Sequence, residues 1–315
     1  MSLNKSLNKQ VTDYLNTHPE NLTGGYQEIA NKFKCKYSLV EHIARNIRNS
    51  KKYRLNSSKT VISLDNNTKE GIHILSGCWH VPFQNKEMQK GLINLIKDLG
   101  DKVVGFHLLG DILDLSSLSK HNPNELGIPG ITLGLEYKEG NKFLDSFESN
   151  LPFNIEKTFI YGNHEDRYFR HLKNIDNSKF ADALPSPTQA LNLKQRGYKI
   201  YEDWKEDFHQ LGKLQLIHGE FCSKNPARTH IDKMKTSVAF VHTHRVDTCF
   251  DGEKAGFNIG WGGDSTSPAF SYVSRLIRMN WINGFALCHI DKDQNYYIQV
   301  IPIYNNKFYY NGKQY

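Results

Sequence analysis

The first fifty residues place apolar side chains at the spacing of short amphipathic helices. Breaker residues from Pro19 to Gly25 separate a first helix from a second over 26–33, and Ser38 opens a third. The inward positions are Leu7, Val11, Tyr14 and Leu15 in the first helix, Tyr26, Ile29, Ala30 and Phe33 in the second, and Val40, Ile43, Ala44 and Ile47 in the third. The pattern predicts a small all-α domain over residues 1–55.

The outward face of the third predicted helix carries basic and amide side chains. Three short helices with a tight turn before such a helix resemble a helix-turn-helix DNA-binding module. The resemblance implies that the third helix enters the major groove and that its outward residues bind nucleic acid, namely His42, Arg45, Asn46, Arg48 and Asn49. Small three-helix bundles also mediate protein contacts, so protein docking is the alternative.

The positive charge of the chain is concentrated at its start. Residues 1–60 hold eight Lys and three Arg against four acidic residues, a net charge of +7. The remaining 255 residues balance 29 basic against 29 acidic side chains. A basic head on a neutral body indicates an anionic partner, with nucleic acid the first candidate. A solvated, lysine-rich surface is the alternative.

From Gly71 the pattern changes to short apolar runs bounded by glycine, which are typical of buried strands. Five such runs are predicted to be strands: GIHILSG, KVVGFHLLG, EKTFIYG, KLQLIHG and SVAFVHTH. A helical pattern lies between the first two, and alternation from Trp281 onward predicts antiparallel strands. The sequence therefore predicts an α/β domain over 71–315, joined to the helical domain by a polar linker over 56–70.

Each of these five strands runs directly into side chains that can bind a metal. They are Cys78 and His80, Asp111, Asn163 and His164, His218, and His242 and His244. Because the carboxyl ends of strands in α/β sheets open onto one crevice, these side chains are expected to cluster. A single histidine at a strand end is more often structural, but five coincidences together favour a site.

Composition limits the location and the partners of the protein. No run of about 18 apolar residues occurs, so neither a transmembrane helix nor a membrane partner is expected. The first residues lack the apolar core of a signal peptide. The five cysteines are scattered and form no CxxC pair, which argues against a disulfide framework or a zinc finger. A cytoplasmic protein is therefore expected.

The strand-end residues form an ordered set of motifs. The set is Cys78-Trp-His80, Gly110-Asp111-Ile-Leu-Asp114, Gly162-Asn163-His164-Glu165, His218-Gly219 and His242-Thr-His244. It resembles the calcineurin-like metallophosphoesterase superfamily, whose motifs are D-x-H, G-D-x-x-D, G-N-H-E/D, H and G-H-T-H. The stretches WHVPF, YGNHEDR and WINGF look most like the bacteriophage and bacterial forms. The resemblance implies a four-layer α/β/β/α sandwich with two mixed sheets.

The resemblance also implies a site for two divalent metal ions bridged by Asp111. The first metal would be held by Cys78, His80, Asp111 and His244, and the second by Asp111, Asn163, His218 and His242. Two metals about 3.5–4 Å apart bind a shared hydroxide, the nucleophile, and clamp the phosphate oxygens.

Three further residues have roles that the resemblance implies. His164 would contact the phosphate and protonate the leaving oxygen, which suits an imidazole. Asp114 would orient His164 and stabilise its charge. Arg167 is a candidate bidentate donor to the phosphate, with a surface salt bridge as the alternative.

Two residues depart from the family pattern. Val241 replaces the glycine of G-H-T-H, which matters only if that position needs a positive φ or a close backbone approach. Cys78 replaces aspartate, and because thiolate is the softer ligand, it favours Zn²⁺ or Fe²⁺ over Mn²⁺. Either a thiolate-ligated pair of metals is competent, or the first site is weakened in a protein that binds without cutting. Retention of the other ligands and of His164 favours activity.

The predicted function is a dinuclear metal-dependent phosphoester hydrolase, a phosphodiesterase or nuclease acting on nucleic acid. The motifs favour an enzyme, and the charge asymmetry favours a nucleic-acid substrate. One alternative is a non-catalytic DNA- or protein-binding module on a degenerate phosphoesterase scaffold. Another is a phosphatase acting on a protein or a small phosphoester. The same ligands serve all of these substrates in the family, so the choice lies in loops such as 115–140.

Overall fold

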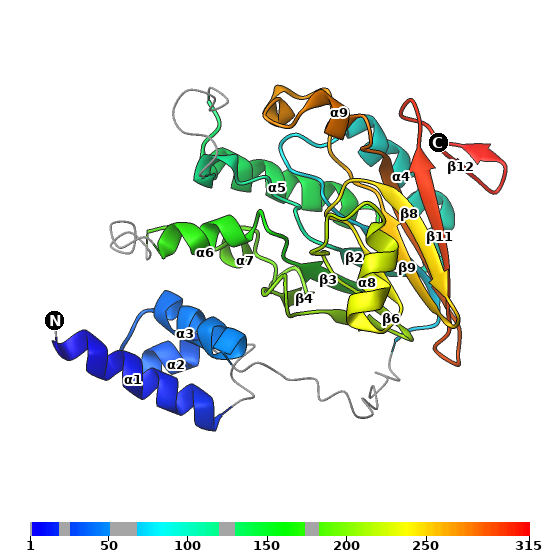
Figure 1. Ribbon diagram of the computed structural model, residues 1–315. Helices are drawn as coiled ribbons and strands as arrows, with labels where there is room; N and C mark the ends of the chain where they lie inside the picture. Colours follow the sequence, from blue (N-terminus) through cyan, green and yellow to red (C-terminus); the bar gives the residue numbers. More distant parts are fainter. Residues whose placement is uncertain (1, 19–25, 51–67, 120–129, 174–182) are drawn as a thin grey trace. The chain divides into compact units, whose positions relative to one another are not determined.

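The computed structural model describes residues 2–18, 26–50, 68–119, 130–173 and 183–315 of the chain (Figure 1). The chain divides into two compact units. One comprises Met1–Ser63 and Phe169–Pro185, and the other Leu64–Tyr168 and Ser186–Tyr315. Residues 56–67 of the expected linker lie outside the described residues. Thr68 already belongs to the second unit, where its hydroxyl accepts a hydrogen bond from the backbone N–H of Gly212 at 3.2 Å.

The N-terminal unit contains the three predicted helices. They are α1 (Ser2–Thr17), α2 (Tyr26–Lys32) and α3 (Tyr37–Ser50). The helix α3 begins at Tyr37, so that Ser38 lies inside its first turn. The predicted apolar stripes form the core, in which the buried side chains are Val11, Leu15, Tyr26, Ile29, Ala30, Val40, Ile43 and Ala44. His42 is half-buried, whereas the side chains of Arg45, Asn46, Arg48 and Asn49 lie outside the described residues.

The second unit is built on two mixed sheets, which confirms the expected fold class. The first has the order β11-β10-β1-β2-β3-β4, with β1 to β4 parallel and β10 and β11 antiparallel to their neighbours. Its strands are β1 (Gly71–Ser76), β2 (Val103–Leu108), β3 (Glu156–Ile160), β4 (Tyr198–Tyr201), β10 (Asn283–Ile290) and β11 (Tyr296–Ile303). The predicted antiparallel C-terminal strands are therefore also confirmed.

The second sheet has the order β5-β6-β7-β9-β8. Its strands are β5 (His209–Leu211), β6 (Leu214–Leu216), β7 (Val238–Phe240), β8 (Val246–Asp251) and β9 (Lys254–Ile259). The strands β6, β7 and β9 are parallel, while β5 and β8 are antiparallel edges. A separate hairpin near the C-terminus pairs β12 (Tyr309–Tyr310) with β13 (Lys313–Gln314).

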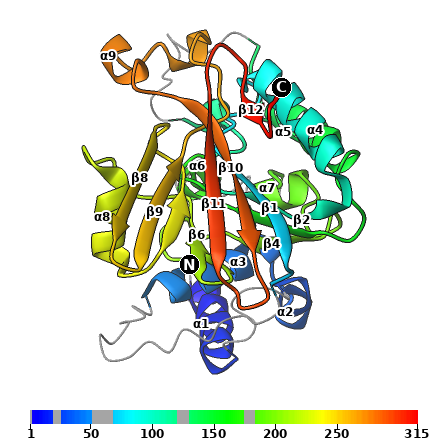
Figure 2. The same ribbon diagram turned by 90° about the vertical axis from the view of Figure 1, so that its right-hand side faces the viewer.

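Helices cover the outer face of each sheet and give the four layers (Figure 2). The longer ones are α4 (Lys86–Leu99), α5 (Leu133–Glu148) and α8 (Pro226–Met234), and the shorter ones are α6 (Asp166–Leu172), α7 (Pro187–Ala190) and α9 (Arg275–Arg278). Within the described residues, 3₁₀ turns lie at Gly100–Lys102, Ser116–Leu118 and Pro268–Phe270. Phe147 of α5 packs on Phe106 of β2 with their ring centroids 5.1 Å apart. None of the helices in the described part of the chain combines the length and the apolar character needed to cross a bilayer.

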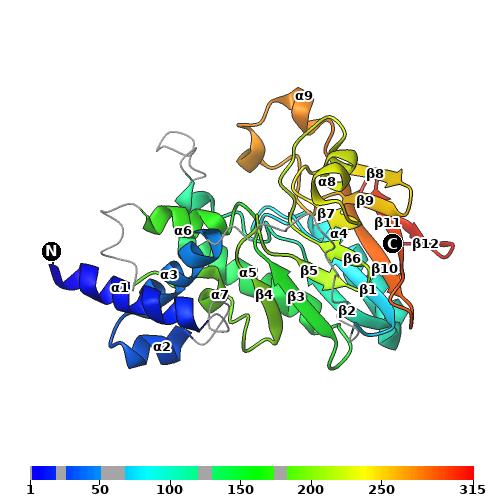
Figure 3. The same cartoon turned by 60° about the horizontal axis from the view of Figure 1, so that its bottom comes forward.

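The two sheets lie beside one another (Figure 3), and their inner faces share one apolar core. Leu75 and Ile160 of the first sheet and Leu216 and Ala239 of the second are fully buried members of it. Each of these residues is the last or the next-to-last residue of its strand, β1, β3, β6 or β7. The core therefore holds these strand ends, from both sheets, beside one another.

Candidate metal centre

The residues that follow five strand ends converge in the second unit. In the first sheet, β1 leads into Cys78 and His80, β2 into Asp111, and β3 into Asn163 and His164. In the second sheet, β6 leads into His218, and β7 into His242 and His244. The loops that carry them are short, because every one of these residues lies within four positions of the end of its strand. The structure therefore brings these residues together from the strand ends of both sheets.

Several of these residues hold an unusual backbone conformation. The residues with a positive φ include Cys78 (48°), His80 (50°), Asp111 (52°), His242 (62°) and His244 (59°). A positive φ is uncommon outside glycine and clusters at functional sites, where the surrounding structure must offset its free-energy cost. The rest of the fold therefore offsets the free-energy cost of directing these side chains towards one point. Gly162 supports the same convergence, since a Cβ there would lie 2.1 Å from Oδ1 of Asp111.

A first cluster of donor atoms comprises Cys78, His80, Asp111 and His244. One ligand atom from each lies within 4.8 Å of those of the others. The Nε2 atoms of His80 and His244 are 3.1 Å apart, and Nε2 of His80 lies 3.9 Å from Oδ2 of Asp111. All four residues are buried. The cluster offers one sulfur, two imidazole nitrogens and one carboxylate, a donor set that suits zinc.

A second cluster comprises Asp111, His218 and His242, whose donor atoms also lie within 4.8 Å of one another. Nε2 of His218 is 3.4 Å from Oδ2 of Asp111 and 3.1 Å from Nδ1 of His242. Oδ1 of Asn163 lies 3.1 Å from the same Nε2. Asp111 is therefore common to both clusters, and the side-chain oxygen of Asn163 adjoins the second.

The environment favours the neutral form of most of these imidazoles, which is the form that binds metals. Burial lowers the pKa of His80, of His244, and of His242, where it reaches about 3. The neighbouring imidazoles lower the pKa of all three further. In His218, burial is outweighed by the negative charge of Asp111, which raises the pKa. Nδ1 of His218 lies 2.9 Å from the carbonyl oxygen of Leu109, so it carries the proton and leaves Nε2 for the cluster.

The sulfur of Cys78 is enclosed by the two clusters. Its side chain is fully buried, and Sγ accepts a hydrogen bond from the backbone N–H of His242 at 3.2 Å. Burial, reinforced by the negative charge of Asp111, raises the pKa of the Cys78 thiol well above its usual range. A bound cation would oppose both effects, because it stabilises the thiolate directly.

Asp114 contacts two histidines. Its Oδ1 lies 2.9 Å from Nδ1 of His80 and 3.2 Å from Nδ1 of His164. Nδ1 of His164 also donates to the backbone carbonyl of Asp114 at 2.7 Å. Although burial opposes ionisation, the two imidazoles hold the pKa of Asp114 far below its usual range. Asp114 therefore orients a residue of the first cluster as well as His164.

Arg167 lies at this site and is mostly buried, with 14% of its side chain exposed. Its Nη1 donates to the carbonyl oxygen of Asp114 at 2.9 Å, and its Nη2 is 3.1 Å from Nε2 of His164. Nε2 of His164 lies in turn 3.9 Å from Oδ2 of Asp111. The guanidinium therefore belongs to the same group of polar side chains as His164, and the surface salt bridge considered from the sequence is not what holds it.

Glu165 has a role that the sequence analysis missed. This fully buried carboxylate accepts hydrogen bonds from the backbone N–H groups of Asp111, Gly162 and Leu113 at 2.8–2.9 Å. It thereby ties the loop after β2 to the loop after β3. Burial and the charge of Asp111 raise the pKa of Glu165 to about 7, whereas the three N–H donors favour its ionised form. In the sequence, the only indication of this role is the position of Glu165 as the last residue of the G-N-H-E motif.

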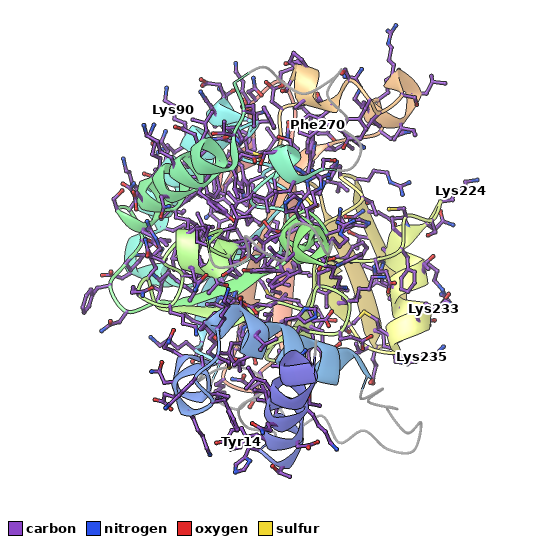
Figure 4. The ribbon with its side chains drawn as sticks, turned by 90° about the vertical axis from the view of Figure 1, so that its left-hand side faces the viewer. Tyr14, Lys90, Lys224, Lys233, Lys235 and Phe270 are labelled. Carbon is purple, nitrogen blue, oxygen red and sulfur yellow. The ribbon has the colours of Figure 1, made fainter. Side chains whose placement is uncertain are left out.

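Two tryptophans that the sequence analysis assigned no role enclose the first cluster. The ring of Trp261 stacks on His244 with centroids 4.6 Å apart, and Trp281 meets the same imidazole edge-on at 4.5 Å. Phe270, labelled in Figure 4, lies 5.5 Å from the ring of His80. These rings exclude water from the first cluster and fix its imidazoles. Only the glycine-bounded W-G-G run after β9 could have indicated Trp261.

The second departure from the family pattern, Val241, is accommodated without strain. Val241 is fully buried and is not among the residues with a positive φ. Its side chain packs near Gly77, where a Cβ would approach Cγ2 of Val241 to 3.1 Å. This position therefore needs no glycine in the present chain.

Comparison with known proteins adds little to this geometry. No protein-family model and no curated protein matches the chain. Among solved structures, vacuolar protein sorting 29 from Cryptosporidium parvum is 12% identical, with a TM-score of 0.42 over 78% of this chain and 98% of that one. Vps29 from Entamoeba histolytica complexed with Zn²⁺ is 12% identical, with a TM-score of 0.38 over 78% of this chain and 96% of that one.

Proposed function

We propose that the chain is a dinuclear metal-dependent phosphoester hydrolase. The observation that carries the proposal is the position of Asp111, whose carboxylate is shared by the two donor clusters. A carboxylate common to two sets of imidazoles is the arrangement that a pair of divalent metals requires. Because the pair would sit where five strand ends meet, it lies at the usual place of an active site in an α/β fold.

The residues present fit such a pair. One metal would be held by Cys78, His80, Asp111 and His244, and the other by Asp111, Asn163, His218 and His242. Sulfur and imidazole ligands favour Zn²⁺ or Fe²⁺, with Mn²⁺ as the harder alternative. When bound, two divalent metals supply Lewis acidity to the phosphoester and a nucleophile at neutral pH.

The other polar side chains would handle the proton and the phosphate. Nδ1 of His164 is occupied by Asp114, so Nε2 is the atom that would hold a proton and deliver it to the leaving oxygen. Arg167 is within hydrogen-bond distance of that Nε2, from which it could move to a phosphate oxygen as a charged donor. Asp114 keeps both imidazoles that it contacts in fixed orientations.

We further propose that the substrate is a phosphodiester of a nucleic acid. The net charge of +7 over residues 1–60, to which Arg45 and Arg48 contribute, supports this substrate. A cavity of about 190 Å³ beside the second cluster is lined by the rings of Trp204 and Phe208, and by two lysines and three acidic residues (Lys205, Lys233, Glu206, Asp207 and Glu220). The ring of Trp204 lies 5.9 Å from that of His218, and Lys233 projects from α8 (Figure 4). The two rings could stack on bases, whereas the charged residues of the lining give it no net positive charge. The cytoplasmic location and the bacteriophage type stay predictions from the sequence.

The test is hydrolysis of bis(4-nitrophenyl) phosphate with added Zn²⁺ or Mn²⁺. Loss of a positioned general acid lowers kcat by roughly 10²–10⁴-fold, which is the result expected for His164→Ala. His289→Ala is the matched control, because it removes an exposed imidazole on β10. Wild-type protein that binds metal without turning over any phosphoester would refute the enzyme and support the alternative of a binding scaffold.

A further inference from the structure

A second group of histidines is buried inside the first sheet, away from the strand ends. His73 of β1, His107 of β2 and Glu156 of β3 each place one donor atom within 4.8 Å of the other two. Both histidines are fully buried. The proposed hydrolytic mechanism uses none of these residues, and the sequence analysis took no account of the group. We propose that His73, His107 and Glu156 form a separate site for a divalent transition metal of the zinc class.

The pairing of the strands builds this group. His73 is directly opposite Gly105 in the parallel pair of β1 and β2, and Gly105 is directly opposite Glu156 in the pair of β2 and β3. His107 lies two residues beyond Gly105, so its side chain is on the same face of the sheet. Three neighbouring strands therefore direct two imidazoles and one carboxylate into the space above a single glycine.

Gly105 keeps that space open. A Cβ at this position would lie 2.1 Å from Nδ1 of His73 and 2.7 Å from Nε2 of His107. Every other amino acid would thus fill the volume between the two nitrogens. A glycine in the middle of a strand weakens the strand, and it often marks a point that something else must approach closely.

The two imidazoles face one another as the proposed ligands of the metal centre do. Nδ1 of His73 is 2.9 Å from Nε2 of His107, compared with 3.1 Å for both the His80–His244 and the His218–His242 pairs. Nε2 of His73 is 2.8 Å from the carbonyl oxygen of Lys69 and must donate to it, which leaves the lone pair of Nδ1 directed inward. A backbone carbonyl that fixes the tautomer in this way is the usual support of a metal-binding histidine.

Hydrogen bonding alone does not satisfy the group. Among the described residues, Nδ1 of His107 is buried and has no hydrogen-bond partner. Burial lowers the pKa of both histidines, so both are neutral and each keeps a nitrogen lone pair. A cation held by Nδ1 of His73 and Nε2 of His107 would take the place of the hydrogen bond between these two nitrogens, and Nδ1 of His107 would then carry the proton.

The third donor of the group, Glu156, is a charged side chain. Glu156 supplies the negative charge, and its Oε1 lies 2.7 Å from Nζ of Lys199 and 3.5 Å from Nε2 of His209. The imidazole of His209 comes from β5 of the second sheet and stacks on His107 with ring centroids 5.1 Å apart. Two imidazoles and a carboxylate are ligands that Zn²⁺ accepts in three-residue sites. A metal here would tie three strands together next to the second sheet.

Zinc stoichiometry of the full chain tests the site without reference to activity. Purified protein is stripped with a chelator, loaded with Zn²⁺, desalted and analysed for zinc per chain. His107→Gln should hold one zinc fewer than the wild type, and Zn²⁺ should raise its thermal midpoint by less. His230→Gln is the matched control, because it removes a buried imidazole that belongs to none of the four groups of donor residues in the described part of the chain, and it should keep the wild-type zinc content.

Equal zinc content in the wild type and folded His107→Gln would overturn the proposal. Anomalous diffraction from wild-type crystals soaked in Zn²⁺ decides the matter if the variant does not fold. A zinc peak between His73, His107 and Glu156 is expected. Soaked crystals with no peak at that position would also overturn the proposal, whatever the occupancy of the candidate metal centre.

Discussion

The backbone N–H of His242 donates a hydrogen bond to the sulfur of Cys78 at 3.2 Å. Cys78 follows β1 of the first sheet, and His242 follows β7 of the second, so this bond links the sheets at their carboxyl ends. It also links the two donor clusters, because the side chains of the two residues belong to different ones. The thiol of Cys78 is therefore held in a defined position.

Replacement of Cys78 should change which metal the first cluster selects. Cys78→Ser removes the thiolate, and we expect the first zinc to be lost. Cys78→Asp supplies a hard oxygen ligand, so the variant should shift its preference from Zn²⁺ towards Mn²⁺. Metal content after equilibration with equal concentrations of both ions measures the shift. A serine variant that retains the zinc content of the wild type would show that the sulfur is not a ligand.

Asp114→Asn should weaken both metal binding and catalysis, because Asp114 contacts His80 as well as His164. Loss of a group that orients a metal ligand typically costs about 10–100-fold in metal affinity or activity. Competition with a chromophoric chelator measures zinc affinity, and hydrolysis of bis(4-nitrophenyl) phosphate measures kcat. If kcat falls while the zinc affinity stays at the wild-type value, Asp114 acts on His164 alone.

The sequence predicted the strand ends and the residues that cluster there, because short apolar runs followed by polar ligands are local patterns. It also predicted the three N-terminal helices from their spacing of apolar residues. It did not predict that β5, β8 and β9 join β6 and β7 in a second sheet, since their pattern is weak and their pairing depends on distant strands. The three-residue strand β5 is too short to show any periodicity.

The contacts that organise the site also could not be predicted from the sequence. Glu165 is visible in its motif, but its three N–H donors come from two loops that meet only in the folded chain. The grouping of His73, His107 and Glu156 depends on strand register, which single-sequence patterns do not fix. Such contacts join residues far apart in the chain, whereas periodicity reports only on neighbours.

His230 should make the metal-free protein less stable in acid. Nδ1 of His230 is 2.8 Å from the carbonyl oxygen of Pro226 and must donate to it, so Nε2 accepts from the backbone N–H of Glu220 at 3.1 Å. Burial lowers the pKa of His230 from its ordinary value of 6.5, and the neighbouring imidazole of His218 lowers it further. Below pH 6.5 the unfolded chain therefore binds a proton at this residue that the folded chain does not, and folding stability falls as the pH falls.

Urea unfolding at pH 8 and at pH 5, with a chelator present, measures this effect. The unfolding free energy of the wild type should fall more between the two pH values than that of His230→Gln. One proton accounts for at most about 1.4 kcal/mol per pH unit of the difference. Glutamine keeps one donor and one acceptor but does not titrate. An identical pH dependence in the two proteins would contradict the prediction.

The basic residues of α3 should govern the salt dependence of DNA binding. If Arg45 and Arg48 contact phosphates, Arg45→Gln/Arg48→Gln should reduce the slope of log affinity against log salt by about 1.8, or about 0.9 for each contact. Fluorescence anisotropy with a labelled duplex over a range of salt concentrations measures the slope. The matched control is Lys90→Gln/Lys97→Gln, which removes two exposed charges from α4 (Lys90 is labelled in Figure 4). If the control lowers the slope as much as the arginine pair does, the binding is a property of total charge, and the role proposed for α3 is wrong.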